Sequence, residues 1–317
     1  MAEVSVIINC LNGERFLSQA ISSIYNQTFP DWDVLFYDNG SNDNSIKIAK
    51  SFDKKIRIYA NPIKVPLGTS RQHAVDLVKG KYISFLDVDD FWYPEKLYLQ
   101  VQNLKTTNYS VCLGGIDVIN EKNKLLYKIP QRHPFGHGFK EQLFQVDCPT
   151  SVTMINKEVL AKKGTRYNHL LKSSCEEDFL LSFLYPNERI AVIDESIAAY
   201  RITTNSVTSV YQQRLGYERM CSIRRLNREI PNLQKIYSFE YKDAKARAYF
   251  YKASFYMHSG EPAKAKKHLH KAAELSSVYK LISFLSIHKI LWRIFFKYKP
   301  KLANTYFALI NKQNYFL

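Results

Sequence analysis

The segment Tyr82–Asp90 is an apolar run that ends in three carboxylates, Asp87, Asp89 and Asp90. A continuous apolar run of this length is typical of a strand covered on both faces, as in a parallel sheet. Burying bare charge is costly, so the acids need solvent, a cation or a basic partner. Ligands bind at the carboxyl edge of open α/β sheets, and hard divalent ions such as Mg²⁺ or Mn²⁺ prefer oxygen ligands. The segment therefore predicts a metal and diphosphate site; the alternative is that Asp89 or Asp90 caps a helix over Pro94–Leu104.

Strand and helix patterns alternate through the first part of the chain. We expect strands at Val4–Ile8, Asp33–Tyr37, Ile56–Tyr59 and Tyr82–Leu86, and helices at Arg15–Gln27, Ser45–Phe52 and Thr69–Val78. This alternation is typical of βαβ units and a parallel sheet. No GxGxxG or GxxxxGK[ST] motif occurs, which argues against a dinucleotide fold or a P-loop.

The middle of the chain continues the domain with shorter elements. We expect a strand at Val111–Ile119 with a Gly114-Gly115 kink, a hairpin partner at Leu125–Ile129, a helix at Lys157–Lys163, a helix at Phe179–Leu184 and an edge strand at Ile190–Ile193.

Four short motifs follow the first four expected strands in order. They are Asn12-Gly13, Asp38-Asn39-Gly40-Ser41-Asn42-Asp43, Arg71 and Asp87–Asp90. Together they make residues 3–205 resemble the family 2 glycosyltransferases, an inverting family with the GT-A fold. The resemblance implies an α/β fold, with a Rossmann-like, mainly parallel sheet flanked by helices. We expect this domain over residues 1–210 and a basic, all-helical extension over residues 211–317.

The resemblance also implies a nucleotide-sugar site and names its residues. The donor would contact Cys10, Leu11, Asn12, Glu14, Asp38, Asn39, Arg71, Asp87, Val88 and Asp90, and Asp89 would hold Mn²⁺ or Mg²⁺. Asn39 stands where the family most often has Asp. Because an amide can both accept and donate, it suits uracil or thymine, and guanine stays open. We expect a UDP-sugar donor; the alternative for Arg71 is a place on a helix surface.

The acids Glu177 and Asp178 match the Glu-Asp pair that supplies this family's catalytic base. Inverting transfer needs a carboxylate that takes the proton of the acceptor hydroxyl as its oxygen attacks. We expect Asp178 to be the base, with Glu177 as the second choice; the alternative is ordinary acids in a first helical turn. Tyr200–Thr203 resembles the family's Tyr-Arg-x-His segment, with Thr203 in place of His. Whether Arg201 covers the diphosphate stays open.

The charge of the chain is concentrated in its last third. Residues 1–210 carry 24 basic and 23 acidic side chains, whereas residues 211–317 carry 21 basic and 6 acidic ones. A basic region of this kind suits a polyanion or an anionic membrane. Ala244–Ser277 is similar to one tetratricopeptide-type helical hairpin, and Leu281–Lys301 is a basic, aromatic-rich segment. The latter could lie in a membrane interface or pack on the core, and we favour the membrane.

The five cysteines are widely spaced and form no CxxC motif, which argues for a reducing compartment and against a zinc site. We see neither a secretory signal nor a run long enough to span a membrane. We therefore expect a cytoplasmic enzyme, peripheral on the inner membrane, that moves a hexose or N-acetylhexosamine to a lipid-linked saccharide of a bacterial surface glycan. The alternatives are a nucleic-acid-binding protein, which lacks a recognised motif, and a non-catalytic sugar-nucleotide binder.

Overall fold

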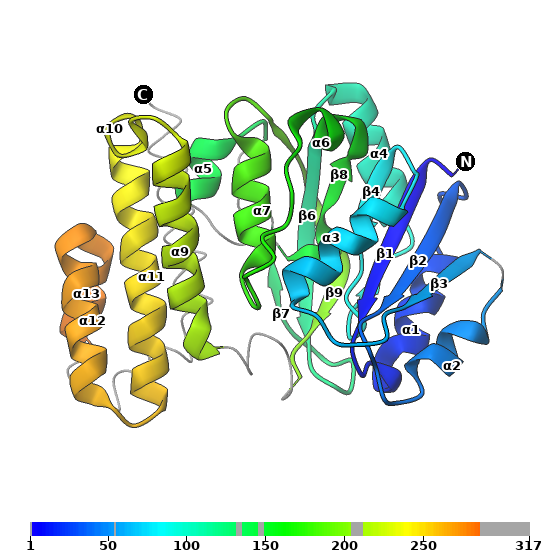
Figure 1. The fold of residues 1–317 in the computed structure, drawn as a ribbon, viewed down its shortest axis with the longest axis horizontal. Coiled ribbons are helices and arrows are strands. Elements are labelled where there is room, and N and C mark those ends of the chain that lie inside the picture. Colours follow the sequence, from blue (N-terminus) through cyan, green and yellow to red (C-terminus); the bar gives the residue numbers. More distant parts are fainter. Residues whose placement is uncertain (1, 54, 131–134, 145–148, 204–211, 286–317) are drawn as a thin grey trace. The chain divides into compact units, whose positions relative to one another are not determined.

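The computed structural model describes residues 2–53, 55–130, 135–144, 149–203 and 212–285. The chain divides into two compact units, Met1–Ser206 and Val207–Leu317. The first unit is built around a sheet and the second is helical (Figure 1). Each unit is described by itself below.

The first unit contains a nine-stranded sheet in its described residues. Its strands are β1 (Val4–Cys10), β2 (Trp32–Asp38), β3 (Ile56–Ala60), β4 (Tyr82–Phe85), β5 (Phe91–Trp92), β6 (Val111–Ile119), β7 (Leu125–Ile129), β8 (Met154–Asn156) and β9 (Ile190–Arg201). The order is β3-β2-β1-β4-β8-β6-β9-β5, and β7 pairs with β6. Strands β3, β2, β1 and β4 are parallel, as are β6 and β9, while β8 runs antiparallel to both of its neighbours.

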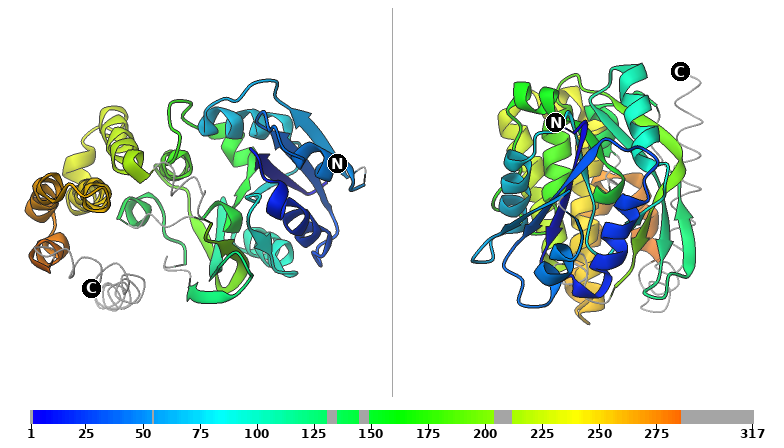
Figure 2. Two further views of the ribbon diagram at one scale, coloured as in Figure 1. Left: turned by 90° about the horizontal axis from the view of Figure 1, so that it is seen from below. Right: turned by 90° about the vertical axis from the view of Figure 1, so that its right-hand side faces the viewer.

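Helices cover both faces of the parallel strands. They are α1 (Glu14–Tyr25), α2 (Ser45–Lys50), α3 (Leu67–Leu77), α4 (Lys96–Thr107), α5 (Phe139–Phe144), the 3₁₀ turn η1 (Thr150–Val152), α6 (Lys157–Lys163) and α7 (Cys175–Leu184). Figure 2 shows α1 and α4 on one face of the sheet and α3 on the other. The buried side of α1 carries Leu17, Ala20, Ile21 and Ile24, which join one hydrophobic core with the sheet. Their helical spacing explains why this segment forms an amphipathic helix.

The predicted parallel α/β sheet is confirmed, but two expectations were wrong. The edge strand expected at Ile190–Ile193 continues to Arg201 and lies between β6 and β5. The polar residues Asp194–Ser196 hid this continuation, because they fall where the register shifts around Gly114 and Gly115. The helix-cap alternative for Asp89 and Asp90 also fails, since the residue before α4 is Glu95.

The second unit contains α9 (Gln212–Glu229), α10 (Leu233–Ile236), α11 (Ser238–His258), α12 (Pro262–Leu275) and α13 (Ser277–Leu285). Helices α11 and α12 form a hairpin that turns at Gly260, whose φ is +78°. Their facing sides bury small and apolar residues, including Ala253, Ala265 and Leu269. Small residues allow the two helix backbones to approach closely, which explains the alanine-rich pattern of both helices.

The basic segment Leu281–Lys301 lies mostly outside the described residues, which end at position 285. Within the described part of the chain, no helix combines the length and the apolar character that crossing a bilayer requires.

Candidate active site

The parallel strands bring the predicted motifs to one edge of the sheet. Cys10 at the end of β1 pairs with Asp38 at the end of β2, and Asp38 pairs with Ala60 at the end of β3. In the same sheet Ile7 pairs with Phe85, which places the start of the Asp87–Asp90 segment beside β1. The carboxyl edge expected to bind ligand therefore collects three of the four motifs.

The first two motifs are interlocked by hydrogen bonds. The Asn12 N–H donates to Ser41 Oγ over 2.9 Å, and the Asn42 N–H donates to Asn12 Oδ1 over 2.9 Å. Asn12 has a φ of +57°, which suits an asparagine in a tight turn. Glu14 accepts from both the backbone and the side chain of Asn44. The side chains of Asn12 and Glu14 thus hold the turn after β1 against the turn after β2.

Val88 and Cys10 shape the floor of the same region. A Cβ added at Gly13 would come within 2.9 Å of Val88 Cβ and 3.2 Å of Cys10 Sγ, so only glycine fits between them. Cys10 is buried, and this burial raises the pKa of its thiol. We therefore assign the side chains of Cys10 and Val88 to packing. Leu11 is half-buried and lies in the turn that follows β1.

Asp38 and Asn39 are both buried and both engaged within the chain. Asp38 Oδ2 accepts from the N–H groups of Gly40 and Ser41. The Asn39 amide donates to the Val65 carbonyl over 2.9 Å and accepts from the Val65 N–H over 3.0 Å. In this arrangement the Asn39 amide ties the segment after β3 to the segment after β2. Reading a base edge would require the Asn39 side chain to share or exchange these bonds.

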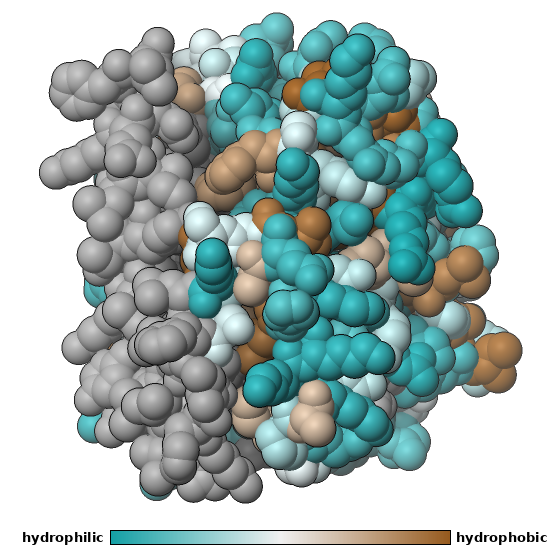
Figure 3. All heavy atoms as spheres, turned by 90° about the vertical axis from the view of Figure 1, so that its left-hand side faces the viewer, coloured by the Kyte–Doolittle hydropathy of each residue, from teal (hydrophilic) through white to brown (hydrophobic). Residues whose placement is uncertain are grey.

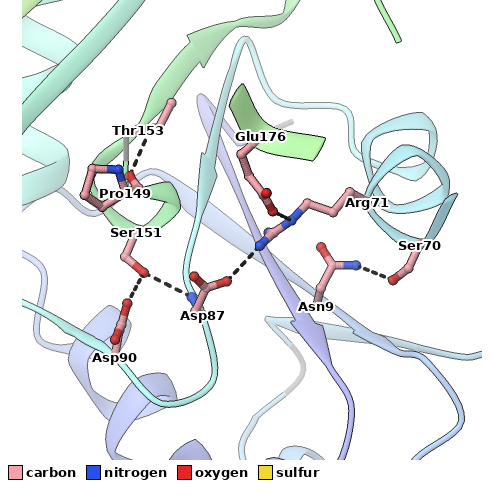
Figure 4. A network of polar contacts seen from close by, with 9 residues as sticks. All are labelled: Asn9, Ser70, Arg71, Asp87, Asp90, Pro149, Ser151, Thr153 and Glu176. Atoms are coloured by element: carbon pink, nitrogen blue, oxygen red, sulfur yellow. Dashed lines mark hydrogen bonds and ion pairs between the residues drawn. The ribbon is translucent and has the colours of Figure 1, made fainter. Parts of the chain in front are cut away.

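Arg71 joins the carboxylate cluster to α7. Its Nε donates to Glu176 Oε1 over 2.7 Å, and its Nη2 donates to Asp87 Oδ1 over 2.9 Å (Figure 4). The Arg71 side chain is 4% exposed, so it is not the helix-surface residue that was the alternative expectation. Glu176 and Asp87 hold the pKa of this arginine well above its usual value despite its burial. The pair of ion bridges links residues 105 positions apart in sequence.

Asp90 is buried and uses both carboxyl oxygens within the protein. Oδ2 accepts from Ser151 Oγ over 2.6 Å and Oδ1 accepts from the Arg201 N–H over 2.9 Å. Burial, followed by the charges of Asp87 and Asp89, raises the pKa of Asp90 well above its usual value. Asp90 thus ties the end of β4 to η1 and β9, and its expected contact with the donor sugar stays a prediction.

Arg201 holds the loop that carries Asp89. Its Nε donates to the Asp89 carbonyl over 2.7 Å, Nη1 donates to Asn123 Oδ1 over 2.6 Å, and Nη2 donates to Gln19 Oε1 over 2.9 Å. The guanidinium lies 4.3 Å from the centroid of the Phe16 ring. Arg201 is 1% exposed. The Arg201 guanidinium thus joins the loop that carries Asp89 to α1 and to Asn123, and whether it also covers the diphosphate stays open.

Asp89 is the carboxylate of the cluster that has the fewest internal bonds in the described structure. Its backbone carbonyl is held by Arg201, and it is partly exposed. Burial, followed by the charge of Asp87, raises the pKa of Asp89 to about 6. A cation bound beside Asp89 would offset this repulsion and lower its pKa again.

The donor set at this edge fits a hard divalent cation. Asp89 and Asp87 offer only oxygen atoms, which Mg²⁺ and Mn²⁺ prefer. Among the described residues, no group of three or more His, Cys, Asp and Glu side chains is placed to enclose a metal. A cation here would therefore take most of its ligands from a bound diphosphate and water, as Mg²⁺ commonly does.

Four buried polar atoms at this edge have no hydrogen-bond partner among the described residues. They are Asn9 Oδ1, Asp38 Oδ1, Asn61 Nδ2 and Arg71 Nη1. Leaving a buried polar atom unpaired costs about 1–3 kcal/mol, so native proteins rarely collect several in one place. Functional sites are where such costs are tolerated, because a ligand can remove them.

The two predicted base residues lie in the first turn of α7. Asp178 is 1% exposed, its N–H donates to the Ser174 carbonyl, and its own carbonyl accepts from Ser182 Oγ. Glu177 is half-buried in the same turn. Glu176, in the same turn, accepts a hydrogen bond from Arg71. Next to Glu176 is a small pocket, and the side chains that line it are mostly apolar: Phe85, Thr150, Thr153, Ile155, Tyr167, Phe179 and Leu180.

Sequence reasoning missed Glu176, Ser151 and Gln19. Glu176 stands next to the Glu-Asp pair and could have been found only as an extra acid in that turn. Ser151 bonds both Asp90 and the Asp87 N–H, but a serine between threonine and valine carries no local signal. Gln19 lies on α1, 182 residues from its partner Arg201.

Comparison with known proteins identifies the family. The family model described as glycosyl transferase family 2 matches residues 5–163. The chain is 29% identical over 212 residues to the UDP-Glc:α-D-GlcNAc-diphosphoundecaprenol β-1,3-glucosyltransferase WfgD of Escherichia coli, covering 65% of this chain and 79% of that protein. It is 28% identical over 221 residues to the glycosyltransferase MJ1057 of Methanocaldococcus jannaschii, covering 67% and 76%.

Solved structures with the same fold include two glycosyltransferases. S. aureus TarS 1-349 in complex with UDP-GlcNAc has a TM-score of 0.66 at 14% identity, covering 91% of this chain and 88% of that one. The mannosyltransferase PcManGT from Pyrobaculum calidifontis, in complex with GDP-Man and Mn²⁺, has a TM-score of 0.61 at 11% identity, covering 93% and 86%. These likenesses confirm the predicted GT-A fold. The chain belongs to glycosyltransferase family 2, and it is a glycosyltransferase of the kind that takes its sugar from a nucleotide donor.

Proposed function

We propose that this enzyme transfers a hexose-type sugar from a UDP-sugar to a saccharide hydroxyl, with inversion and with a divalent metal. The observation that carries the proposal is the Arg71 bridge. The buried Arg71 guanidinium binds Asp87, in the loop after β4, and Glu176, in the first turn of α7. Its third nitrogen, Nη1, has no partner among the described residues. A donor phosphate or sugar hydroxyl is the kind of acceptor that this nitrogen lacks.

The donor would lie along the carboxyl ends of β1, β2 and β4. The unpaired Asp38 Oδ1 is an acceptor suited to the ring N–H of a pyrimidine base. Asn39 would contribute to base binding by fixing the wall around Val65, or directly after exchanging those bonds. The relative WfgD is named for a UDP-Glc donor, which supports uridine over guanosine for this chain.

Asp89 is the residue that would hold Mn²⁺ or Mg²⁺, which acts as a Lewis acid that offsets charge on a leaving nucleoside diphosphate. Arg201 positions Asp89 through the backbone, and Asp90 fixes the loop from the buried side. The solved mannosyltransferase in complex with GDP-Man and Mn²⁺ supports this assignment.

Asp178 would be the general base, with Glu177 as the second choice. The base must take a proton from the acceptor hydroxyl while its oxygen attacks the anomeric carbon opposite the leaving group. Asp178 shares its helical turn with Glu176, and Glu176 is bonded to the Arg71 that also binds the donor loop. This arrangement would keep the base and the donor in a fixed relation, which favours reaction between bound groups.

The acceptor we propose is a lipid-linked saccharide at the cytoplasmic face of the inner membrane, where the enzyme would act as a peripheral protein. The support is the name of WfgD, whose acceptor is GlcNAc-diphosphoundecaprenol. The β linkage in that name is what inversion of an α-linked donor gives.

The test is a donor panel. UDP-, GDP- and dTDP-sugars would be incubated with the protein and Mn²⁺ while nucleoside diphosphate release is followed, with Asp89→Ala and, as a matched control, Asp194→Asn at an exposed position of β9. We expect slow hydrolysis of a UDP-sugar that is lost with a chelator and in Asp89→Ala, and is kept in Asp194→Asn. Release that is unaffected by chelator or by Asp89→Ala would contradict the metal assignment. No release and no binding for any donor would contradict the proposed function.

A further inference from the structure

Three helices of the second unit present basic and aromatic side chains at helical spacing. Tyr249, Lys252 and Tyr256 lie on one side of α11, since they are three and four residues apart. His268 and Lys271 have the same spacing on α12, and Tyr217 lies on α9. We call these six residues the Tyr–Lys surface.

Ring and hydroxyl contacts join the six residues into one surface. Lys252 Nζ lies 3.7 Å from the centroid of the Tyr217 ring, and the Tyr217 and Tyr256 hydroxyls are 3.3 Å apart. The rings of Tyr256 and His268 are stacked, with centroids 5.4 Å apart and planes 2° apart. Lys271 Nζ lies 5.6 Å from the centroid of the Tyr249 ring. Because α9, α11 and α12 all contribute, the surface is a product of the fold and not of one charged helix.

Among the described residues, neither Lys252 nor Lys271 forms an ion pair with an acid, whereas the neighbouring Lys264 is paired with Glu261. Burial, followed by the charges of Arg224 and Lys271, lowers the pKa of Lys252, with Cys221 acting in the opposite direction. Burial and then Lys252, Lys271 and Lys267 likewise lower the pKa of His268. Figure 3, which views the molecule from the left-hand side of Figure 1, shows hydrophilic residues over much of the described part of that face. Cations held close together favour an anionic ligand.

The aromatic rings narrow the choice of anion. Tyr256 is stacked on His268 and Lys252 covers Tyr217, so one face of each of these two tyrosine rings is occupied. Single-stranded nucleic acids bind to basic grooves through bases stacked on ring faces, and the occupied faces cannot serve for that. What it offers outward is ammonium groups and tyrosine hydroxyls; Tyr217 is 47% exposed. These groups suit phosphate oxygens and sugar hydroxyls.

We propose that the Tyr–Lys surface is a second binding site, which holds the phosphate-bearing part of a saccharide acceptor. This proposal rests on the proposed function for the nature of the acceptor. The shared chemistry is a phosphate group next to a sugar, and its source is either a lipid-linked saccharide diphosphate or a soluble phosphorylated glycan.

The experiment measures binding of the full-length protein to phosphatidylcholine vesicles that carry a GlcNAc-diphospholipid, by sedimentation. Vesicles with phosphatidylglycerol at equal charge, a soluble phosphorylated glycan and an oligonucleotide are the comparison probes. The test variant is Lys252→Gln/Lys271→Gln. Arg224→Gln/Lys264→Gln, at exposed positions bordering the surface, serves if the first variant fails to fold. The control is Lys235→Gln/Lys266→Gln, which removes the same charge from exposed positions away from it.

We expect the test variants to lose roughly 30-fold in affinity for the GlcNAc-diphospholipid vesicles, about fivefold for each cation removed. The control should stay within about twofold of the wild type, and donor hydrolysis should be unchanged in all variants. If the soluble phosphorylated glycan competes, the site reads the phosphorylated sugar itself; if only the lipid form binds, it reads the diphosphate at the membrane.

Equal affinity of the test and control variants would overturn the proposal. So would phosphatidylglycerol vesicles that bind as tightly as the diphosphate-sugar vesicles, or an oligonucleotide that binds more tightly than either. Failure of donor hydrolysis in the wild type would count against the proposed function, and this binding measurement would still stand because it needs no donor.

Discussion

The two units of this chain treat charge in opposite ways. In the first unit three acids meet at a sheet edge, and buried arginines hold them: Arg71 binds Asp87, and Arg201 binds the Asp89 backbone. In the second unit Lys252 and Lys271 lie against tyrosine rings and form no ion pair with an acid among the described residues. The difference teaches that the first unit pairs its buried charges internally, whereas the second leaves cations at a surface, where they favour an anion.

The largest effect should come from replacing Asp178, the proposed base in the first unit. Asp178→Asn should lower the transfer rate by about 10²–10⁴-fold, because a positioned general base contributes that much, while donor binding stays unchanged. Transfer assays and donor titration would be compared with Glu177→Gln. If Glu177→Gln lost transfer and Asp178→Asn did not, the second-choice residue would be the base.

Replacing Arg201 tests whether the first unit depends on its buried arginines. Arg201→Lys should cost about 3 kcal/mol of unfolding free energy, because a lysine cannot reach the Asp89 carbonyl, Asn123 and Gln19 together. Urea unfolding measures this, with exposed Arg57→Lys as the matched control. A loss of less than about 0.5 kcal/mol would show that the loop carrying Asp89 does not need these bonds.

A smaller effect is expected from replacing Glu176, which links α7 through Arg71 to Asp87 after β4. Glu176→Gln should cost about 1–3 kcal/mol of stability, because the amide keeps a hydrogen bond to Arg71 but not the charge. It should also weaken donor binding. The control Glu158→Gln breaks the exposed pair with Lys162 and should cost less than about 0.5 kcal/mol. Equal effects in the two variants would argue that the Arg71 bridge is no more important than a surface pair.

The smallest effect concerns pH and sharpens the contrast between the clusters. The pKa of Asp89 is raised to about 6, so in the metal-free folded protein its ionisation above that pH costs stability, whereas below about pH 4 it is protonated in both states. Asp89→Asn should therefore raise the melting temperature at pH 8 in chelator by a few degrees and leave it unchanged at pH 4. A melting temperature at pH 8 that is equal to or below that of the wild type would contradict the destabilisation that we attribute to ionised Asp89.

The fold was predictable because its signals are local. Apolar runs such as Val4–Ile8 and the motifs at their carboxyl ends need only a few neighbouring residues to be recognised. The meeting of the motifs at one edge was also predictable, since parallel strands place their carboxyl ends there. The roles of individual side chains were not, because they depend on distant partners. Asn39 is hydrogen-bonded to Val65, and Arg201 is hydrogen-bonded to Gln19. Neither pairing can be recognised from the spacing of residues in the sequence.

The direct test of the central claim is calorimetric titration of a UDP-sugar into the wild type and Asp89→Ala, each with Mn²⁺ and with chelator. If the carboxyl edge is a metal-assisted nucleotide site, the wild type should bind in Mn²⁺ and lose most of its affinity in chelator, and Asp89→Ala should show the weak binding in both. Equal affinity of all four samples would contradict it.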